Sequence, residues 1–355
     1  MNLWTHALPP LAVALLALPP AWQGGAMLLL PTAALMGAVL AAVHHAEVVA
    51  HRVGEPLGTL VLALAVTVIE AALIVTMMLA GGGAEAELPR DTIFSAVMII
   101  CNGVVGMCLL AGGWRHHEQQ FRIEGANAGL AALIALCTLT LVLPTFTTSS
   151  AGPTYTASQL GFAAVASLVL WLVWVFVQTI SHRDYFLPPG EVRDDPHVHA
   201  EPPSARAAWT SVALLLVALV GVVGLAKQLS PAIESAVRAA GAPRAVIGIV
   251  IAMLVLLPET VAALRAALAN RLQTSMNLAF GSALASIGLT IPVVAVASLW
   301  LGLPLTLGLS PKDLALLVLT FLVSAVTLAS GRSHLMLGAV HLVIFAAFLF
   351  LALVP

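Results

Sequence analysis

Long apolar runs separated by short polar breaks extend along the whole chain. Each run is about 20 residues long, the length of a helix that crosses a hydrocarbon core about 30 Å thick. The breaks carry charged and turn-forming residues, as in HRVGEP, GGGAEAELPRD and GGWRHHEQQFRIEG. This pattern predicts eleven membrane-spanning helices, at residues 9–22, 25–46, 57–80, 92–113, 126–144, 158–180, 207–227, 243–267, 275–299, 312–330 and 333–353.

The composition is that of a chain that faces lipid. Hydrophobic residues make up 61% of it and charged residues only 8%, against roughly 25% charged residues in an ordinary soluble domain. We therefore expect an all-α polytopic membrane protein in contact with the lipid bilayer. The net charge of -2 gives no reason to expect nucleic acid as a partner. The three cysteines, Cys101, Cys108 and Cys137, lie in apolar runs and are interpreted as packing residues.

The basic residues are unevenly distributed over the predicted loops. Nine of the 14 Lys and Arg residues follow even-numbered spans, which leaves five for the other side. Because cytoplasmic loops carry the excess of Lys and Arg, the N-terminus is predicted in the cytoplasm and the C-terminus outside.

The eleven spans divide into one N-terminal helix and two sets of five. The predicted parts are an N-terminal transmembrane helix at 1–24, a first repeat at 25–182, a cytoplasmic linker rich in His and acidic residues at 183–206, and a second repeat at 207–355. Because five is odd, the two sets enter the membrane from opposite sides, as in the inverted repeats of many secondary transporters. The linker side chains could bind a regulatory cation, although a short charged linker is usually only solvated; they are Asp194, Asp195, His197 and His199.

Two acidic residues lie well inside predicted spans. Fourteen of the sixteen Asp and Glu residues fall in loops or at span ends, whereas Glu70 and Glu259 lie within the third and eighth spans. A charge at the bilayer centre costs at least about 2.5 kcal/mol, so such residues usually face a cavity or a partner on an ion or proton pathway. The alternative is a protonated Glu that donates a hydrogen bond between helices. Both acids occupy the second helix of their set, which favours a site at the midplane between repeats.

Each acid has a neighbouring oxygen on its own helix that could contribute to a cation site. Thr67 precedes Glu70 by three residues and shares its helix face, where its hydroxyl could act as a ligand. Pro258 precedes Glu259 and has no N–H, so the carbonyl of Leu254 loses its helical partner. A freed carbonyl beside a carboxylate is a site for a hard cation, although proline kinks also occur in membrane helices without any ligand.

The span after each acid carries small and polar residues. Ser95 and Asn102 lie in SAVMIICNGVVG, and Ser282 and Ser286 lie in GSALASIG. They are candidate supporting residues for the site, or they serve only the close packing of membrane helices. In the last span, His341 is either packed or part of a proton relay.

Paired buried carboxylates predict ion exchange. Burial favours the protonated form and a bound cation favours the ionised form, so two carboxylates at one site would hold either protons or a cation. If the empty, doubly ionised state cannot cross the membrane barrier, the protein is an antiporter. A divalent ion balances two carboxylates best, so Ca²⁺ is the first expectation and Na⁺ or K⁺ the alternative. Glu70 and Glu259 are thus the expected metal ligands, and no cofactor is expected.

Several long segments resemble a known family. They are HHAEVVAHRVGEPLGTLVLALAVTVIEAALIVTMML, RDTIFSAVMIICNGVVGMCLLAGG, VLLPETVAALRAALANRLQTSMNLAFGSALASIGLTIPVVA and SGRSHLMLGAVHLVIFAAFLF. In them the chain is similar to bacterial calcium/proton (sodium/proton) antiporters of the cation/calcium exchanger superfamily. The resemblance implies two inverted five-helix repeats plus an N-terminal helix, location in the bacterial inner membrane, cation/proton antiport, and a site at Glu70 and Glu259.

The chain departs from that family at one place. Much of the wider family has Gly-Asn three to four residues before each glutamate, where this chain has Val66-Thr67 and Val255-Leu256. The choice between calcium and sodium or potassium therefore stays open.

Proteins of two other classes are alternatives to an antiporter. A passive cation channel would fit an acid-lined path but needs no inverted repeat. An intramembrane hydrolase is not expected, because the chain has neither HExxH nor G-x-S-x-G.

Overall fold

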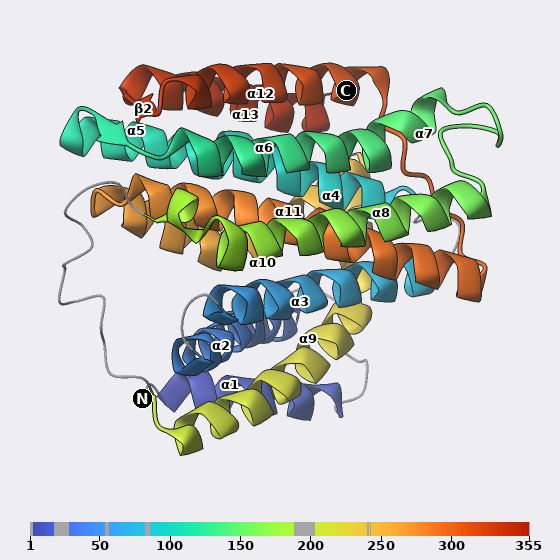
Figure 1. The fold of residues 1–355 in the computed structure, drawn as a ribbon. Coiled ribbons are helices and arrows are strands. Elements are labelled where there is room, and N and C mark those ends of the chain that lie inside the picture. The colour runs from blue at the N-terminus through green and yellow to red at the C-terminus, as the bar shows by residue number, and fades with distance from the viewer. Residues whose placement is uncertain are drawn as a thin grey trace. The chain divides into compact units, whose positions relative to one another are not determined.

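The computed structural model describes residues 3–17, 28–53, 57–81, 86–187, 203–239, 241 and 243–354. The end of the predicted first span and the linker residues Asp194, Asp195, His197 and His199 lie outside these residues. Helices make up most of the described chain (Figure 1). In chain order the elements are α1 (Leu3–Leu16), α2 (Leu29–Val53), α3 (Leu57–Gly81), α4 (Leu88–Met98), η3 (Ile99–Val104), α5 (Val105–His116), β1 (Gln119–Gln120), α6 (Ile123–Cys137), η4 (Thr138–Val142), α7 (Leu143–Phe146), α8 (Ala157–Phe176), η5 (Val177–Ser181), η6 (Arg183–Phe186), α9 (Ala205–Ala239), α10 (Ala245–Leu268), α11 (Leu272–Leu301), α12 (Pro311–Ala329), β2 (Arg332–Ser333) and α13 (Leu335–Leu353).

The predicted all-helical membrane fold is confirmed. Among the described residues, eight helical segments are long and apolar enough to cross a membrane, namely Leu29–Val53, Leu88–His116, Ile123–Phe146, Ala157–Ser181, Ala205–Leu229, Leu272–Leu301, Pro311–Ala329 and Leu335–Leu353. A ninth candidate is α10, whose segments Ala245–Leu257 and Glu259–Leu268 meet at an angle of 53°. Two shorter apolar helices cover Leu3–Leu16 and Leu64–Leu79.

Two helix boundaries differ from the predicted spans because proline did not stop the helix. The first helix begins at Leu3 and includes Pro9 and Pro10, whereas the sequence placed its span at 9–22. α9 continues through Pro231 to Ala239, whereas the sequence placed a loop after residue 227. Membrane helices tolerate proline because neighbouring groups satisfy the backbone atoms that it frees.

Contacts divide the chain into two compact units, each described by itself. The first unit contains residues 1–85 and 197–247, and therefore α1, α2, α3 and α9. Within it, α2 packs along α9, and α1 packs against both. Small residues permit this approach: a Cβ atom at Gly221 of α9 would lie 2.8 Å from the Cβ atom of Ala12 in α1. The buried imidazole of His45 joins the same three helices through Thr5 O (2.9 Å) and Ser211 Oγ (3.1 Å).

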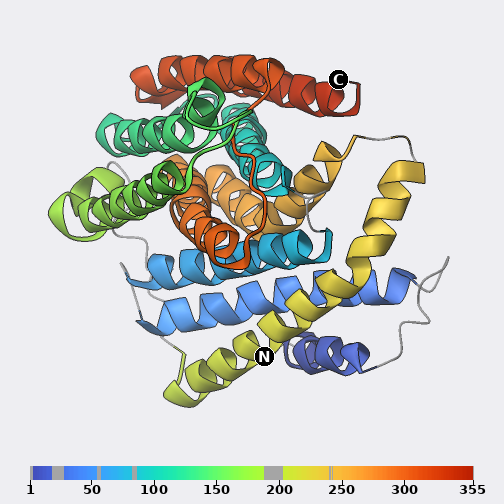
Figure 2. The ribbon, with the colours of Figure 1, turned by 90° about the vertical axis from the view of Figure 1, so that its right-hand side faces the viewer.

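The second unit contains residues 86–196 and 248–355. In it α5 packs along α13 and α11 packs along α8, while α6 contacts both α11 and α12. Figures 1 and 2 show α12 and α13 (red) side by side and next to α5 and α6 (cyan to green). Three short segments of the unit, η3, η4 and η5, are π-helical turns within longer spans. Such turns are rare and often mark functional positions.

Candidate functional site

Glu259 lies where α10 bends. The 53° angle joins the segment that ends at Leu257 to the one that begins at Glu259, which places Pro258 at the break. Proline is a usual cause of so sharp a bend, and the freed Leu254 carbonyl stays a prediction. Glu259 and Leu254 are both half-buried. The hydroxyl of the following residue, Thr260, donates to the carbonyl of Leu256 at 2.7 Å. The Leu256 carbonyl therefore already accepts a hydrogen bond from a side chain.

Glu70 lies in the first unit, within α3. Its side chain is 3% exposed, and the Thr67 side chain is 4% exposed. The two residues lie three positions apart on one helix, so they share a face as predicted. This acid is thus buried within a 25-residue helix.

The fourth span supplies two of the predicted supporting residues. Ser95 is buried, and its hydroxyl donates to the carbonyl of Asp91 one turn earlier. Asn102 is fully buried within the π-helical turn η3. The other two supporting residues lie on α11, where Ser286 is buried and Ser282 is half-buried.

Contacts at both ends align α10 with the fourth span. At the start of each, a Cβ atom at Gly248 would lie 2.9 Å from the backbone carbonyl carbon of Asp91. At the other end, His116 Nε2 lies 3.0 Å from the carbonyl oxygen of Leu268. The two helical segments therefore run side by side in the same direction.

Glu259 and Asn102 both lie well inside these two segments of the second unit. Glu259 follows Gly248 by eleven residues, and Asn102 follows Asp91 by eleven residues. Counted from the other end, Glu259 is nine residues before Leu268 and Asn102 is fourteen residues before His116, a difference of about 7 Å. Both residues therefore lie in the interior of neighbouring segments in one unit.

Ser286 lies at a similar depth on the antiparallel helix α11. Near the start of that helix, the Gln273 side-chain oxygen accepts from the Arg122 backbone N–H at 2.6 Å. Ser286 is thirteen residues beyond Gln273, and Asn102 is fourteen residues before His116, both about 20 Å from the same end of the unit. η3 and α11 are in contact, so the Asn102 amide and the Ser286 hydroxyl lie on neighbouring segments of this unit.

Asn102 is also part of a polar network that extends to the last two helices. Its Nδ2 donates to Thr320 Oγ1 of α12 at 2.9 Å, and its Oδ1 lies 3.2 Å from Nδ1 of His341 in α13. His341 Nε2 lies 3.0 Å from Thr327 Oγ1. All four side chains are at most 1% exposed. The sequence marked Asn102 and His341 separately; Thr320 and Thr327 were missed, although their spacing of seven residues places them on one helix face.

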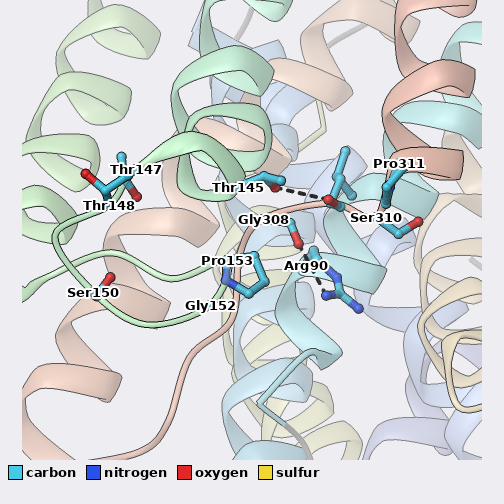
Figure 3. A pocket seen from close by; sticks show the side chains of 11 residues that line it. Arg90, Thr145, Thr147, Thr148, Ser150, Gly152, Pro153, Gly308, Ser310 and Pro311 are labelled. Carbon is cyan, nitrogen blue, oxygen red and sulfur yellow. Dashed lines mark hydrogen bonds between the residues drawn. The ribbon is translucent and has the colours of Figure 1, made fainter.

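A separate cavity of about 620 Å³ lies at the end of the second unit where α4 begins. Figure 3 shows hydroxyl side chains around it, from Thr145, Thr147, Thr148, Ser150 and Ser310, with Arg90 at one side. Arg90 Nη1 donates to the carbonyl of Gly308 at 3.3 Å, and its guanidinium also contacts Glu87 and Asp91 at 3.1 and 2.8 Å. Its only charged lining residue is cationic, so this cavity is not the predicted cation site.

The described residues contain few groupings of side chains that typically bind metals. Within the described residues, no three His, Cys, Asp or Glu side chains gather in a way that could hold a metal ion. The cysteines Cys101, Cys108 and Cys137 are buried and free, as their predicted packing role requires. A cation bound within this part of the chain would therefore need neutral oxygens besides carboxylates.

Comparison with known proteins identifies relatives over most of the chain. The family model described as sodium/calcium exchanger protein matches residues 24–180 and 210–354. A putative ionic transporter of Sinorhizobium fredii is 50% identical, with 93% of this chain and 89% of the relative covered. The sodium-potassium/proton antiporter ChaA of Escherichia coli is 34% identical, with coverage of 90% and 87%. A Ca²⁺/H⁺ antiporter of Aphanothece halophytica is 25% identical, with coverage of 92% and 89%.

Solved structures share the fold at lower sequence identity. The structure of native YfkE superimposes with a TM-score of 0.72 at 19% identity, covering 99% of both chains. The crystal structure of the H⁺/Ca²⁺ exchanger CAX gives a TM-score of 0.71 at 15% identity, covering 98% of this chain and 86% of that one. This chain therefore has the same overall fold as these two proteins.

Proposed function

Because this chain belongs to the sodium/calcium exchanger protein family, we propose that it is a cation/proton antiporter of the bacterial inner membrane that works by alternating access. Glu70 and Glu259 bind either the cation or the protons. The observation that carries this proposal is the position of these two acids, each well inside an apolar helix that has no other acidic residue near it. Such residues are expensive in a membrane, and function is the usual reason for keeping them.

The proposed architecture is an N-terminal helix followed by two inverted five-helix repeats. The eight clear spans, the bent α10 and the two shorter apolar helices correspond to the eleven predicted spans, and we place the repeats at 25–182 and 207–355. Packing in the second unit supports this assignment. The third helix of each set lies against the fifth helix of the other, α5 on α13 and α11 on α8.

Glycines support the same two-fold relation at the residue level. A Cβ atom at Gly106 of α5 would lie 3.0 Å from the Cβ atom of His341 in α13. A Cβ atom at Gly288 of α11 would lie 2.6 Å from the Cβ atom of Trp171 in α8. In each repeat, a glycine of the third helix leaves room for a side chain from the fifth helix of the other repeat. Two inverted copies of one packing pattern would produce this arrangement.

The mechanism follows from the chemistry of buried carboxylates. With no cation bound, burial favours protonated Glu70 and Glu259, and an arriving cation displaces the protons. The two titrations are coupled, so protons and cation belong to the pair rather than to one residue. Thr67, Ser95, Asn102, Ser282 and Ser286 and the Leu254 carbonyl freed by Pro258 are the proposed supporting groups. Protonated and cation-loaded forms reorient, whereas the doubly ionised form does not.

Calcium is the first cation that we propose, because two carboxylates balance its charge. Sodium or potassium is the second candidate, for two reasons. The Escherichia coli relative, which is named a sodium-potassium/proton antiporter, is more similar to this chain than the Ca²⁺/H⁺ antiporter of Aphanothece halophytica. Moreover, Thr67 and Leu256 offer fewer side-chain oxygens than the amides found at these positions in much of the wider family.

Proton flux in proteoliposomes tests the proposal. Purified protein is reconstituted into vesicles with an acidic interior, and a pH-sensitive dye reports proton release after Ca²⁺, Na⁺ or K⁺ is added in turn, with protein-free vesicles as the control. We expect Ca²⁺ to release protons. A response to Na⁺ or K⁺ but not to Ca²⁺ would replace the first candidate by the second. If none of the three ions releases protons, cation/proton exchange itself is contradicted.

A further inference from the structure

His341 occupies a central position in the second unit that the exchange mechanism above does not use. It is fully buried, and it lies six residues after the first residue and twelve before the last residue of the 19-residue helix α13. Its ring contacts Asn102 and Thr327. Asn102 belongs to η3. One imidazole in the last helix therefore binds the π-helical turn of the fourth span.

The surrounding bonds determine which ring nitrogen carries the proton. The Thr320 hydroxyl donates to the carbonyl of Leu316 at 2.8 Å, so its oxygen accepts from Asn102 Nδ2. The amide is thereby oriented with Oδ1 toward His341, and an oxygen acceptor requires a donor at Nδ1. Nε2 then accepts from the Thr327 hydroxyl. A neutral imidazole protonated at Nδ1 satisfies each of these bonds.

The neutral form also agrees with the charges nearby. The groups that form hydrogen bonds with the ring are an amide and a hydroxyl, and among the described residues none of the ion pairs includes His341. A buried imidazolium without an anionic partner is unfavourable. The ring is therefore suited to holding neighbouring groups in place rather than to carrying a proton across the membrane.

The turn that His341 contacts lies beside a helix that carries another proposed supporting residue. η3, which contains Asn102, contacts α11, which carries Ser286. A π-helical turn is intrinsically less stable than α-helix and persists where tertiary contacts support it. Close approach of α13 is possible because position 106 is glycine.

The corresponding place in the other half lacks this polar link. There Trp171 of α8 lies against Gly288 as His341 lies against Gly106. The residue four positions before Gly288 is Leu284, whereas the residue four positions before Gly106 is Asn102. The imidazole–amide pair is thus present in one half only, and general packing of the two-fold fold does not require it.

We infer that neutral His341 is a positioning residue for exchange, which acts from the last helix by holding Asn102 and the π-helical turn of η3 in place beside α11. This inference rests on the proposed function, since positioning has meaning only for a protein that transports. Through Asn102, the ring sets the apparent affinity for the cation, and it is not a carrier of the transported proton.

Three substitutions test this role in the reconstituted full-length protein, with Ca²⁺ and Na⁺ as separate probes. His341→Leu removes the donor to Asn102 and should raise the apparent KM for the transported cation about tenfold, the effect of losing roughly one buried hydrogen bond. His341→Asn keeps a donor near the Nδ1 position and should stay within about twofold of the parent, with an unchanged pH profile. His334→Asn, at the exposed N-cap of the same helix, is the matched control and should change nothing.

Two results with the single variants would overturn the inference. One is a His341→Leu variant with the parent's KM. The other is a His341→Asn variant that loses proton coupling, because the ring itself would then carry the proton. A double variant with Asn102→Leu should be no worse than Asn102→Leu alone, and additive losses would contradict action through Asn102. If His341→Leu does not yield monodisperse protein, Thr327→Val applies the same test through the Nε2 bond.

A spectroscopic measurement separates this inference from the proposed function. ¹⁵N NMR of histidine-labelled protein, with His341→Asn used to assign the signal, should show a neutral ring protonated at Nδ1 between pH 6 and pH 8. An imidazolium or an Nε2-protonated ring would overturn the inference, whether or not the protein exchanges ions. Failure of every cation to move protons would instead contradict the proposed function.

Discussion

At the residue scale, the two intramembrane acids are the part of the site that the sequence predicts most directly. A carboxylate in an apolar run is visible from composition alone, because its cost in a bilayer is large whatever its neighbours are. Contacts between side chains on different helices are harder to predict. Asn102 and His341 are 239 positions apart, and the helix periodicity that reveals neighbours one turn away carries no information about contacts between distant helices.

The first prediction at this scale concerns pH. Protons must leave Glu70 and Glu259 before a cation binds, so raising pH should lower the apparent KM for the cation until the carboxylates are fully ionised. A plot of log KM against pH should have a slope of about -2 if one cation displaces two protons and about -1 if it displaces one. Initial rates in proteoliposomes at several symmetric pH values give this slope. A KM that is independent of pH would contradict competition at a shared carboxylate site.

At the element scale, the bend in α10 determines how Glu259 is presented. We expect Pro258→Ala to restore an N–H toward the Leu254 carbonyl and to straighten the helix, since proline costs about 3 kcal/mol relative to alanine in a helix interior. The variant should be at least as heat-stable as the parent but should exchange more slowly or with a higher KM for the cation. Pro292→Ala in the middle of α11 is the matched control. If both variants exchange at the parent's rate, the bend has no role in transport.

The packing of α13 on α5 gives a second prediction for this scale. A Cβ atom at Gly338 would clash with the backbone N of Leu110, whereas a Cβ atom at Gly161 of α8 would meet nothing within 4 Å. Gly338→Ala should therefore lower stability by about 1–3 kcal/mol, while Gly161→Ala should raise it by about 0.5–1 kcal/mol. Melting temperatures in one detergent compare the two. Equal melting temperatures would contradict the close contact of α13 with α5.

Elements differ in how far the sequence determines them. Apolar runs predicted the long helices well, because a membrane span must satisfy all its backbone groups internally and so must be helical. They did not predict that α9 passes through Pro231 or that the fourth span contains a π-helical turn. The π-helical turn is in contact with distant parts of the chain, as in the bond from Asn102 to Thr320 in α12. The pairing of β1 with β2, which joins the loops before α6 and α13, is likewise a product of tertiary structure.

At the scale of the whole molecule, the distribution of Lys and Arg predicts an orientation. Reporter fusions should place the loop around His197 in the cytoplasm and the C-terminus at Pro355 outside, because cytoplasmic loops carry the excess of positive charge. Fusions at both ends of the chain should report opposite sides. If both ends lie on the same side, the number of spans is even, and neither the eleven-span arrangement nor the inverted repeat can be correct.

The central claim, that Glu70 and Glu259 alternate between protons and a cation, is tested most directly by replacing each with glutamine. Gln keeps the size and hydrogen bonding of Glu but cannot release a proton, and removing an ionisable group from the membrane interior does not harm folding. Cation-driven proton flux should be measured for Glu70→Gln and Glu259→Gln in proteoliposomes that contain equal amounts of monodisperse protein. Our account predicts that both variants fold and that neither shows coupled exchange. Full exchange by either variant would contradict it.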